Sequence, residues 1–277
     1  MSMSEQPDEQ NMNNDPSGRV PSVSVIMPVR NEPVSLEYML RLLPALVDFD
    51  YEIVVVVDTM ADTSIAAVEA ASEQNPHIRL VLNDLGKGAM NAVRAGIQAA
   101  ECDYVMLFAA DEIGPVFIIN QMHELMMRGC DMVSCTRYAW GGARLGGSAI
   151  GGALSRMANY LLNKVIGTCL TDLTTGIKMI RRDKAIAFEF ECQPVGWAFA
   201  LELAVKAEYD GWKLGEVPLI SVDRMFGGES SFRVGSWTVE YFRWFRWAAT
   251  HRSRAADCKA EVLVPHIKGV GQPPAVT

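Results

Sequence analysis

The chain has 277 residues, of which 49% are hydrophobic, and its formal net charge is −8. This length can bury a sizeable core in one large domain or two small ones, and the acidic balance argues against nucleic-acid binding, which requires a basic face. The six cysteines form no CxxC pair and the four histidines are scattered, so we expect reduced thiols, as in a cytosolic protein, and no zinc site.

The two ends of the chain have the composition of loose segments. Residues 1–20 are polar and acidic and lack the apolar stretch of a signal peptide, so we expect a disordered tail there. Residues 255–277 are expected to form a second, flexible tail. No apolar run approaches the roughly 18 residues that a membrane-spanning helix needs. We therefore expect a cytoplasmic protein.

Between residues 21 and 137, short apolar runs alternate with segments of helical spacing. The expected strands cover residues 23–29, 51–58, 77–83, 103–111 and 131–137. The expected helices cover residues 35–47, 64–74, 87–101 and 116–129. This alternation predicts an α/β fold with a mostly parallel sheet and helices on both faces. Right-handed crossovers place the carboxyl ends of such strands at one edge, where ligands bind.

The second half of the chain is less regular. Its expected elements are a glycine-rich loop at 137–147, helices at 149–166 and 197–212, a strand at 213–220 and a mobile loop at 223–236. The helix at 197–212 carries Glu202.

The segment at 237–254, WTVEYFRWFRWAATHRSR, closes the ordered part of the chain. It places Trp237, Tyr241, Trp244 and Ala248 on one helical stripe, and its arginines supply positive charge. We predict an amphipathic helix that lies in an anionic membrane interface without spanning it. The alternative is that the aromatic side chains pack on the domain or form a homodimer contact.

Polar residues follow three of the predicted strands. Arg30, Asn31 and Glu32 follow the first, Asp58 closes the second, and Asp111 follows the strand near residues 104–108. Either aspartate alone could equally cap the helix after it. Together these residues favour a binding site at one edge of the sheet.

Gly86 and Gly88 bracket Lys87 at a strand-to-helix junction. A flexible backbone, a helix N-terminus and a lysine suit a phosphate group. The spacing matches neither the dinucleotide-binding nor the P-loop signature, so a plain turn before a helix is the alternative.

Seven motifs in a fixed order carry a family resemblance that covers residues 23–247. They are VIMPVRNE, VVVDTMADTS, LGKGAMNAVRAGI, SRMAN, DLTTGIKMIRR, EVP and RMFGGES. This series resembles the inverting family-two glycosyltransferases of GT-A fold, most closely the dolichol-phosphate mannose synthase group. The resemblance implies a Rossmann-like GT-A domain over 21–236, followed by the amphipathic helix, and an enzyme that depends on a nucleotide sugar.

The chain departs from the family pattern at three places. The family carries Asp-x-Asp after the fourth strand, whereas this chain has Ala109, Ala110 and Asp111. The family tends to have two successive acids at the end of the second strand, whereas Asp58 is followed by Thr59. The loop before SRMAN lacks the tryptophan and arginine that the lipid-dependent enzymes often show.

The resemblance also implies a donor site for a GDP- or UDP-sugar. The residues expected to contact the donor are Pro28, Arg30, Glu32, Asp58, Lys87, Ala110, Asp111 and Arg233. Asp111 is expected to hold Mg²⁺ or Mn²⁺, because such cations bind through one or two carboxylates plus substrate phosphates and water. Glu112 is expected to point elsewhere, since neighbouring side chains diverge on an extended chain. The alternative is a metal-free site in which Lys87, Arg224 or Arg233 supplies the positive charge.

The residues expected to take part in catalysis are Asp111, Arg224, Glu202 and Asp172. Transfer develops negative charge on the leaving diphosphate, and Arg224 lies in a glycine-containing loop that can close over it. A lipid phosphate is already an anion and needs no general base, whereas an alcohol needs a carboxylate such as Glu202 or Asp172. The alternative roles are structural, with Glu202 paired to a loop arginine and Asp172 capping the turn at 174–176.

The predicted function is sugar transfer from a nucleotide sugar to a polyprenyl phosphate, by a protein peripheral to the inner face of the membrane. A soluble small molecule or a glycan is the alternative acceptor. Two other classes are a catalytically inactive homologue that binds nucleotide sugars, and a nucleotidyltransferase, which releases pyrophosphate.

Overall fold

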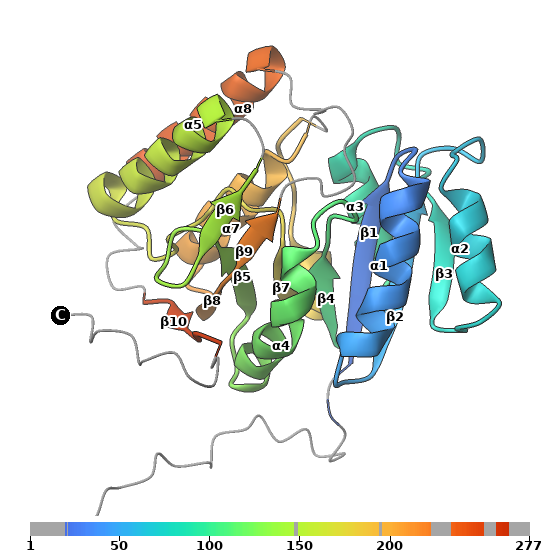
Figure 1. Ribbon diagram of the computed structural model, residues 1–277. Helices are drawn as coiled ribbons and strands as arrows, with labels where there is room; N and C mark the ends of the chain where they lie inside the picture. The colour runs from blue at the N-terminus through green and yellow to red at the C-terminus, as the bar shows by residue number, and fades with distance from the viewer. Residues whose placement is uncertain are drawn as a thin grey trace, which may run out of the picture.

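The computed structural model describes residues 20, 22–146, 149–193, 196–222, 234–251 and 259–265. For residues 149–150 and 234–238 it describes the backbone only. An eight-stranded sheet in the order β10-β8-β5-β7-β4-β1-β2-β3 runs through the molecule, with helices on its two faces (Figure 1).

The strands are β1 (Val23–Val29), β2 (Tyr51–Val57), β3 (Ile78–Leu82), β4 (Tyr104–Leu107), β5 (Met132–Thr136), β6 (Ala143–Leu145), β7 (Lys178–Arg181), β8 (Leu214–Pro218), β9 (Ile220–Val222) and β10 (Glu261–Val262). The α-helices are α1 (Pro33–Leu46), α2 (Ile65–Ser72), α3 (Ala89–Ala99), α4 (Ile119–Met127), α5 (Ala149–Tyr160), α6 (Arg182–Ala187), α7 (Phe199–Tyr209) and α8 (Val234–Thr250). A 3₁₀ turn, η1 (Gly114–Ile118), precedes α4, and a π-helical segment, η2 (Leu161–Ile166), continues α5.

The large sheet is mostly parallel, as the sequence predicts. β1 pairs in parallel with β2 and β4, and β5 pairs in parallel with β8. β7, for which the sequence predicts no strand, is antiparallel to both β4 and β5. An antiparallel strand starts at the edge where its parallel neighbours end. The loop that leads into β7 therefore lies at the carboxyl edge of β4 and β5.

The core forms one layer on each face of the sheet, because side chains of a strand alternate between its faces. In β2, Val55 and Val57 pack in the cluster that includes α1 and α4, whereas Val54 and Val56 pack in the cluster that includes α3 and α7. Gly96 lets α3 approach the sheet closely, since a Cβ atom there would lie 2.3 Å from Ile26 Cγ2. Alanine at this position would overpack the layer at a cost of about 1–3 kcal/mol.

The C-terminal helix runs over Val234–Thr250, whereas the predicted span is 237–254. Trp244 and Ala248 of the predicted stripe are 1% and 7% exposed and belong to the core cluster of α3 and α7. These two side chains cannot face a membrane, so the alternative in which the stripe packs on the domain is correct for them. The reason is that α7 offers an apolar surface on this side of the sheet. Val239 and Phe242 are 68% and 69% exposed, so the outward apolar side of α8 is a different one.

The predicted flexible tail over 255–277 contains an ordered strand. Glu261–Val262 forms β10, which pairs in parallel with β8, and Arg128 Nη1 lies 2.9 Å from Glu261 Oε1. The free edge of β8 explains this order, because it offers backbone groups that need partners. Residues 1–19 of the predicted disordered tail (1–20) lie outside the described residues, as do residues 223–233 of the predicted mobile loop (223–236).

Four of the five cysteines in the described residues agree with the prediction of reduced thiols. Cys102, Cys130, Cys135 and Cys192 are free thiols. Cys169 is disulfide-bonded, so the prediction of reduced thiols is wrong for this residue. The sequence contains no CxxC pair that would indicate a disulfide. The bond at Cys169 therefore depends on which segments the fold places next to it.

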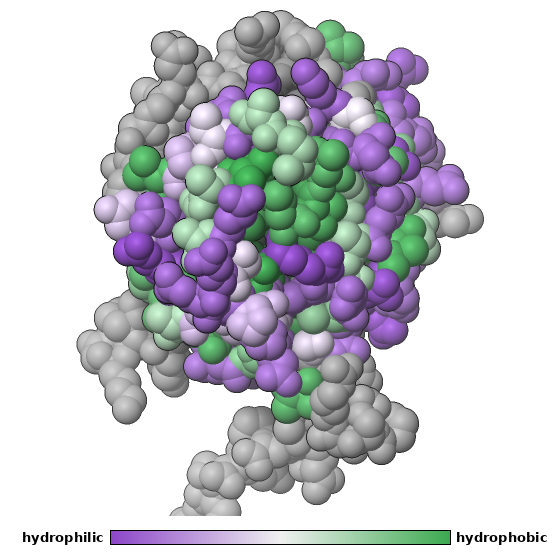
Figure 2. Space-filling view, turned by 90° about the vertical axis from the view of Figure 1, so that its right-hand side faces the viewer, coloured by the Kyte–Doolittle hydropathy of each residue, from purple (hydrophilic) through white to green (hydrophobic). Residues whose placement is uncertain are grey.

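Figure 2 shows the side of the molecule on which β3 and α2 lie, where an apolar area is bordered by hydrophilic residues. β3 is the outer strand at this end of the sheet, and its Leu82 is 48% exposed. β10 and β8 lie at the opposite end of the sheet order. In Figure 1, α8 lies at the upper left, whereas β3 and α2 lie at the right. The apolar area is therefore separate from the exposed side chains of α8.

Candidate active site

The polar residues that follow β1, β2 and β4 lie at one edge of the sheet. β1 lies between β2 and β4 and is parallel to both, so all three strands end on the same side. Arg30 follows β1 and is exposed, Asp58 follows β2 and is half-buried, and Asp111 lies four residues after the end of β4 and is half-buried. The structure thus brings the predicted donor residues of these three strand ends to a common edge.

The turn after β1 is held by the turn after β2. Both carboxylate oxygens of the buried Asp62 accept a hydrogen bond from Asn31 N at 3.1 Å. Glu32 N donates to Ser64 Oγ at 2.9 Å. These bonds stabilise the left-handed backbone of Asn31, whose φ is 53°, a conformation that asparagine tolerates better than most residues. Arg30 and Glu32 are therefore presented by a rigid turn.

Asp58 connects the end of β2 to the glycine–lysine loop. Its Oδ1 accepts from Asn83 Nδ2 at 2.7 Å and its Oδ2 accepts from Gly88 N at 3.2 Å. Gly88 is the residue before α3 and has a φ of 128°, which favours glycine. Asp58 thus holds the turn that carries the exposed Lys87 and does not cap the helix that follows β2.

The segment after β4, where the family has Asp-x-Asp, contains two consecutive acidic residues, Asp111 and Glu112. Ala110 is buried in the core, Ala109 is half-buried, and both Asp111 and Glu112 make polar interactions. Glu112 lies close enough to Arg137 for its charge to contribute to the raised pKa of the guanidinium.

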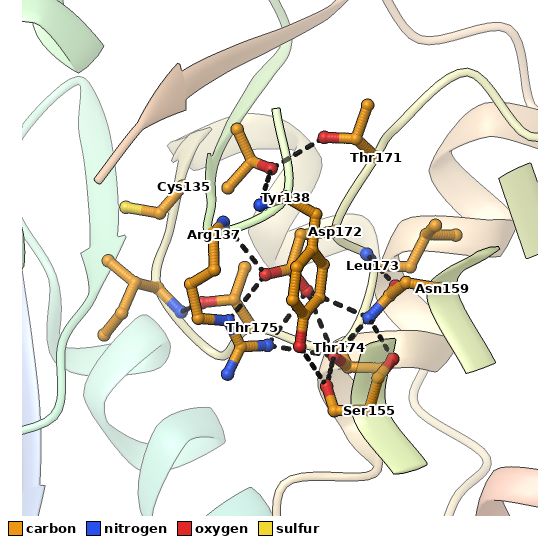
Figure 3. A network of polar contacts seen from close by, with 12 residues as sticks. Cys135, Arg137, Tyr138, Ser155, Asn159, Thr171, Asp172, Leu173, Thr174 and Thr175 are labelled. Atoms are coloured by element: carbon orange, nitrogen blue, oxygen red, sulfur yellow. Dashed lines mark hydrogen bonds and ion pairs between the residues drawn. The ribbon is translucent and has the colours of Figure 1, made fainter. Parts of the chain in front are cut away.

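Arg137 and Asp172 form a buried ion pair at the end of β5 (Figure 3). Arg137 Nε lies 2.7 Å from Asp172 Oδ2 and Nη2 lies 3.0 Å from Oδ1, a two-point contact. Asp172 is 0% exposed, and burial alone would raise the pKa of its carboxyl. The charge and hydrogen bonds of Arg137 outweigh burial and hold that pKa below its usual value. Asp172 is therefore an anion at neutral pH and a weak proton acceptor.

Hydroxyl and amide groups complete this network. Arg137 Nη2 also donates to Thr174 Oγ1 at 3.0 Å, and Asn159 Nδ2 donates to the same oxygen at 2.8 Å. The Tyr138 hydroxyl donates to Ser155 Oγ at 2.9 Å. Figure 3 shows these side chains converging from the end of β5, from α5 and from the loop before β7. Within the described part of the chain, Arg137 Nη1 makes no hydrogen bond, so it can bind a further anion.

Two more arginines lie near Arg137. The guanidinium carbon atoms of Arg137 and Arg156 lie 5.3 Å and 5.6 Å from the centroid of the Tyr138 ring. Arg144 Nη1 would lie 3.4 Å from a Cβ atom at Gly152, so this arginine reaches α5. Arg137 and Arg156 thus flank one aromatic ring, and the charge of Arg137 is shared with Asp172.

A second buried carboxylate fixes the loop that carries Asp172. Glu216 of β8 accepts hydrogen bonds from Thr171 N at 2.8 Å, Thr171 Oγ1 at 2.9 Å and Asp172 N at 3.2 Å. Burial raises the pKa of Glu216 to about 7. In β7, Lys178 is 0% exposed and donates to Ser134 Oγ at 2.9 Å, and burial lowers its pKa to about 8. Both residues lie beneath the network and stabilise its position.

Glu202 has the contacts of a structural residue. It is 0% exposed and accepts from Glu191 N at 2.6 Å and from Cys192 N at 2.9 Å. Among the described residues its ionic partner is Lys206, 2.8 Å away on the same helix, and the pairing with a loop arginine stays a prediction. Arg224 and Arg233 lie outside the described residues. Pro28 is half-buried in β1.

The sequence prediction missed Arg137 as a site residue. The signal was present, because Arg137 directly follows the buried strand β5, just as Arg30 follows β1. Ser155, Asn159 and Thr174 had no comparable signal. They approach Arg137 only through the packing of α5 and the loop before β7.

Strand-end acids and a cluster of arginine and hydroxyl side chains thus share the carboxyl edge of a mostly parallel α/β sheet, which is the edge where such sheets bind ligands. Residues 24–187 match the family described as Glycosyl transferase family 2. The chain belongs to this family.

Curated relatives have longer chains. A dolichol-phosphate mannosyltransferase of Pyrococcus furiosus is 28% identical over 225 residues, which cover 80% of this chain and 62% of that protein. An undecaprenyl-phosphate 4-deoxy-4-formamido-L-arabinose transferase of Sodalis glossinidius is 31% identical over 172 residues, covering 59% of this chain and 50% of that protein. The chain therefore spans about half to three fifths of the length of these relatives.

A solved structure supports the fold. Glucosyl-3-phosphoglycerate synthase of Mycobacterium tuberculosis, in complex with Mn²⁺, UDP and glucosyl-3-phosphoglycerate, superimposes with a TM-score of 0.65 at 16% identity. The match covers 83% of this chain and 80% of that one. The Rossmann-like GT-A prediction is confirmed.

Proposed function

We propose that this chain transfers a sugar from a GDP- or UDP-sugar to an anionic acceptor, with a polyprenyl phosphate as first choice, and inverts the linkage. The observation that supports this best is the Arg137–Asp172 pair, in which Arg137 Nη1 has no hydrogen-bond partner among the described residues and lies at the edge of the predicted donor residues. The two lipid-phosphate transferases among the relatives support the choice of acceptor.

The donor is proposed to lie over the ends of β1 and β2. Arg30 and Glu32 stand on the turn fixed by Asp62, where they can contact the base and ribose. Asp58 holds the backbone before α3, so Lys87 and the helix N-terminus can approach the phosphates.

A divalent cation fits this site only together with the donor. Among the described residues, no three His, Cys, Asp or Glu side chains gather to hold a metal ion. Asp111 offers one carboxylate, and Mg²⁺ can bind through one or two carboxylates plus substrate phosphates. We propose that Asp111 holds Mg²⁺ or Mn²⁺ when the nucleotide is bound. The cation would neutralise charge on the leaving diphosphate. Synthase structures that contain UDP with Mn²⁺ or with Mg²⁺ support this assignment.

The acceptor phosphate is proposed to bind at Arg137 Nη1, with Arg144 and Arg156 beside it. An anionic acceptor attacks without losing a proton, so no general base is needed. This agrees with the low pKa of Asp172, which makes its carboxylate a poor base. We therefore assign Asp172 to positioning Arg137, and Glu202 to holding residues 191–192.

A soluble anionic acceptor is the second candidate. The solved synthase contains a soluble phosphorylated product, glucosyl-3-phosphoglycerate, on the same fold. An arginine cluster recognises the phosphate group in either case. If the acid that Ala109 replaces is essential for transfer, we expect the protein to bind nucleotide sugars without catalysing transfer.

The protein is proposed to bind the inner face of the membrane peripherally. No helix within the described ranges is long and apolar enough to cross a bilayer. Val239 and Phe242 project outward from α8, and the exposed Arg243 and Arg246 lie on the same helix. Exposed apolar and basic side chains together suit an anionic lipid surface.

The test is a product assay with labelled GDP- and UDP-sugars and two acceptors, a polyprenyl phosphate in vesicles and a water-soluble phosphate monoester. The expected result is metal-dependent transfer of label into the organic phase, with release of a nucleoside diphosphate. Label that stays in a new aqueous product would support the soluble acceptor. Release of pyrophosphate, or no consumption of any nucleotide sugar, would overturn the proposal.

A further inference from the structure

A small pocket lies away from the residues of the predicted donor site, where η2, α7 and α8 meet. Its lining residues are Ile166, Gly167, Thr168, Val205, Glu208, Tyr209, Trp247, Ala248 and His251. The volume is about 280 Å³, including the part open to solvent. Gly167 is exposed, whereas Thr168 and Glu208 are 8% and 2% exposed, so the two polar side chains lie at its inner end.

Two buried oxygen atoms in this pocket lack partners. Glu208 Oε2 accepts a hydrogen bond from Cys169 N at 3.0 Å, but Glu208 Oε1 accepts none from the described residues. Thr168 Oγ1 is also buried without a partner there. Buried polar atoms are nearly always hydrogen-bonded, and an unsatisfied one costs about 1–3 kcal/mol. A bound group that donates to both oxygens would remove this cost.

The charges around the pocket favour a cation. Burial raises the pKa of Glu208 to about 7, and the groups that oppose this rise are the backbone of Cys169 and Leu170, which carry no charge. Among the described residues, none that lines the pocket is a lysine or an arginine. The aromatic rings of Tyr209, Trp247 and His251 also line the pocket. The ring centroids of Trp247 and His251 are 4.2 Å apart and the rings are stacked. Aromatic rings attract ammonium groups as well as excluding water.

Size and donor number select the kind of cation. The enclosed part of the pocket has room for about one water-sized group, and an ammonium head is of that size. Ca²⁺ requires six to eight oxygen ligands, whereas two buried oxygens are unsatisfied here. An ammonium group has several N–H donors and no acceptor, which matches a carboxylate and a hydroxyl.

We propose that this pocket binds a small protonated amine, either the ammonium ion or the head of a primary alkylammonium, between Glu208 Oε1 and Thr168 Oγ1. The bound group would border the loop that carries Asp172, because Glu208 also holds Cys169 N. The inference does not depend on the proposed transferase activity.

The experiment is a thermal-unfolding titration of the full chain with ammonium chloride and with methylammonium chloride. Sodium chloride and tetramethylammonium chloride at equal ionic strength are the reference salts. The expected result is a saturable rise in Tm of roughly 5 °C with ammonium or methylammonium, and none beyond the sodium chloride baseline with tetramethylammonium. A response to ammonium alone would identify the free ion, and a stronger response to methylammonium would identify an alkylated amine.

Two pocket variants and one control complete the design. Glu208→Gln and Thr168→Val should each abolish the amine-specific rise, and Thr168→Val carries the test if Glu208→Gln does not fold. Glu69→Gln changes an exposed carboxylate of α2 and should keep the full response. No amine-specific rise in the unmodified chain would overturn the proposal and leave water as the occupant. An undiminished rise in a folded pocket variant would also overturn it.

Discussion

At the residue scale, the Arg137–Asp172 pair shows how burial and charge decide a role. Burial would favour a neutral Asp172, but the two-point contact with Arg137 keeps the carboxylate ionised. The guanidinium stays charged in turn, because burial would lower its pKa but Asp172 raises it above the usual value. Each partner thus keeps the other charged, and within the described ranges Arg137 Nη1 remains available to a ligand.

Arg137→Lys should therefore impair transfer while retaining a positive charge. Lysine cannot make the two-point contact with Asp172 and also present a free N–H edge. We expect kcat/KM for the acceptor to fall by about 10²-fold, in the range found when one electrostatic contact in an active site is removed. Nucleotide binding should be little changed.

Steady-state kinetics with a varied acceptor, and a thermal shift with UDP or GDP, check this prediction. Arg41→Lys is the matched control, because Arg41 is an exposed residue of α1 that pairs with Glu37 in its own helix. An Arg137→Lys protein with unchanged acceptor kinetics would remove Arg137 from the site.

Asp111→Asn keeps the size of the side chain and removes its charge. If Asp111 holds the cation on the donor diphosphate, the rate should fall by about 10²–10³-fold. EDTA should inhibit the unmodified protein. Glu112→Gln is the adjacent comparison and should have a smaller effect on the metal dependence. Full activity in EDTA would discard the metal, and full activity of Asp111→Asn would discard the residue.

At the element scale, α8 shows that a helical stripe does not by itself say which surface it meets. The spacing of Tyr241, Trp244 and Ala248 is the same whether they face lipid or protein. Here Trp244 and Ala248 pack in the core cluster of α7, and Phe242 remains 69% exposed. The membrane proposal thus depends on the outward side of the helix.

Phe242→Asp tests this outward side without disturbing the core. Burying a large apolar side chain in the interface contributes about 1.5–3 kcal/mol, so its loss should weaken vesicle binding by about tenfold or more. Flotation with anionic vesicles at low salt measures the binding, and the Tm verifies that the variant is folded. If the unmodified protein remains at the bottom of the gradient, α8 is not a lipid-binding element and a soluble acceptor becomes the better choice.

At the scale of the whole molecule, two buried carboxyl groups connect stability to pH. Burial raises the pKa of both Glu208 and Glu216 to about 7, from an ordinary value of 4.5. Between these two pH values the folded state binds more protons than the unfolded state, so stability falls as pH rises. Lys178, whose pKa burial lowers to about 8 from 10.5, acts in the separate window between those values.

The free energy of unfolding should therefore increase as pH falls from about 7 toward 5. Each carboxyl group contributes on the order of 1–3 kcal/mol across the window. Glu216→Gln should flatten this dependence by about half. Denaturant unfolding of both proteins at several pH values measures it. A free energy that rises with pH over this range would show that neither carboxyl group is desolvated as described.

The sequence by itself determined the parallel strands, the alternating helices and the common edge for Arg30, Asp58 and Asp111. Strand and helix periodicities are local, and crossover handedness then fixes on which side the strands end. Only the tertiary structure decided the antiparallel insertion of β7, the pairing of Arg137 with Asp172, the burial of Trp244 and the disulfide at Cys169. Each of these depends on which distant segment lies opposite a residue, and no pattern along the chain specifies that neighbour.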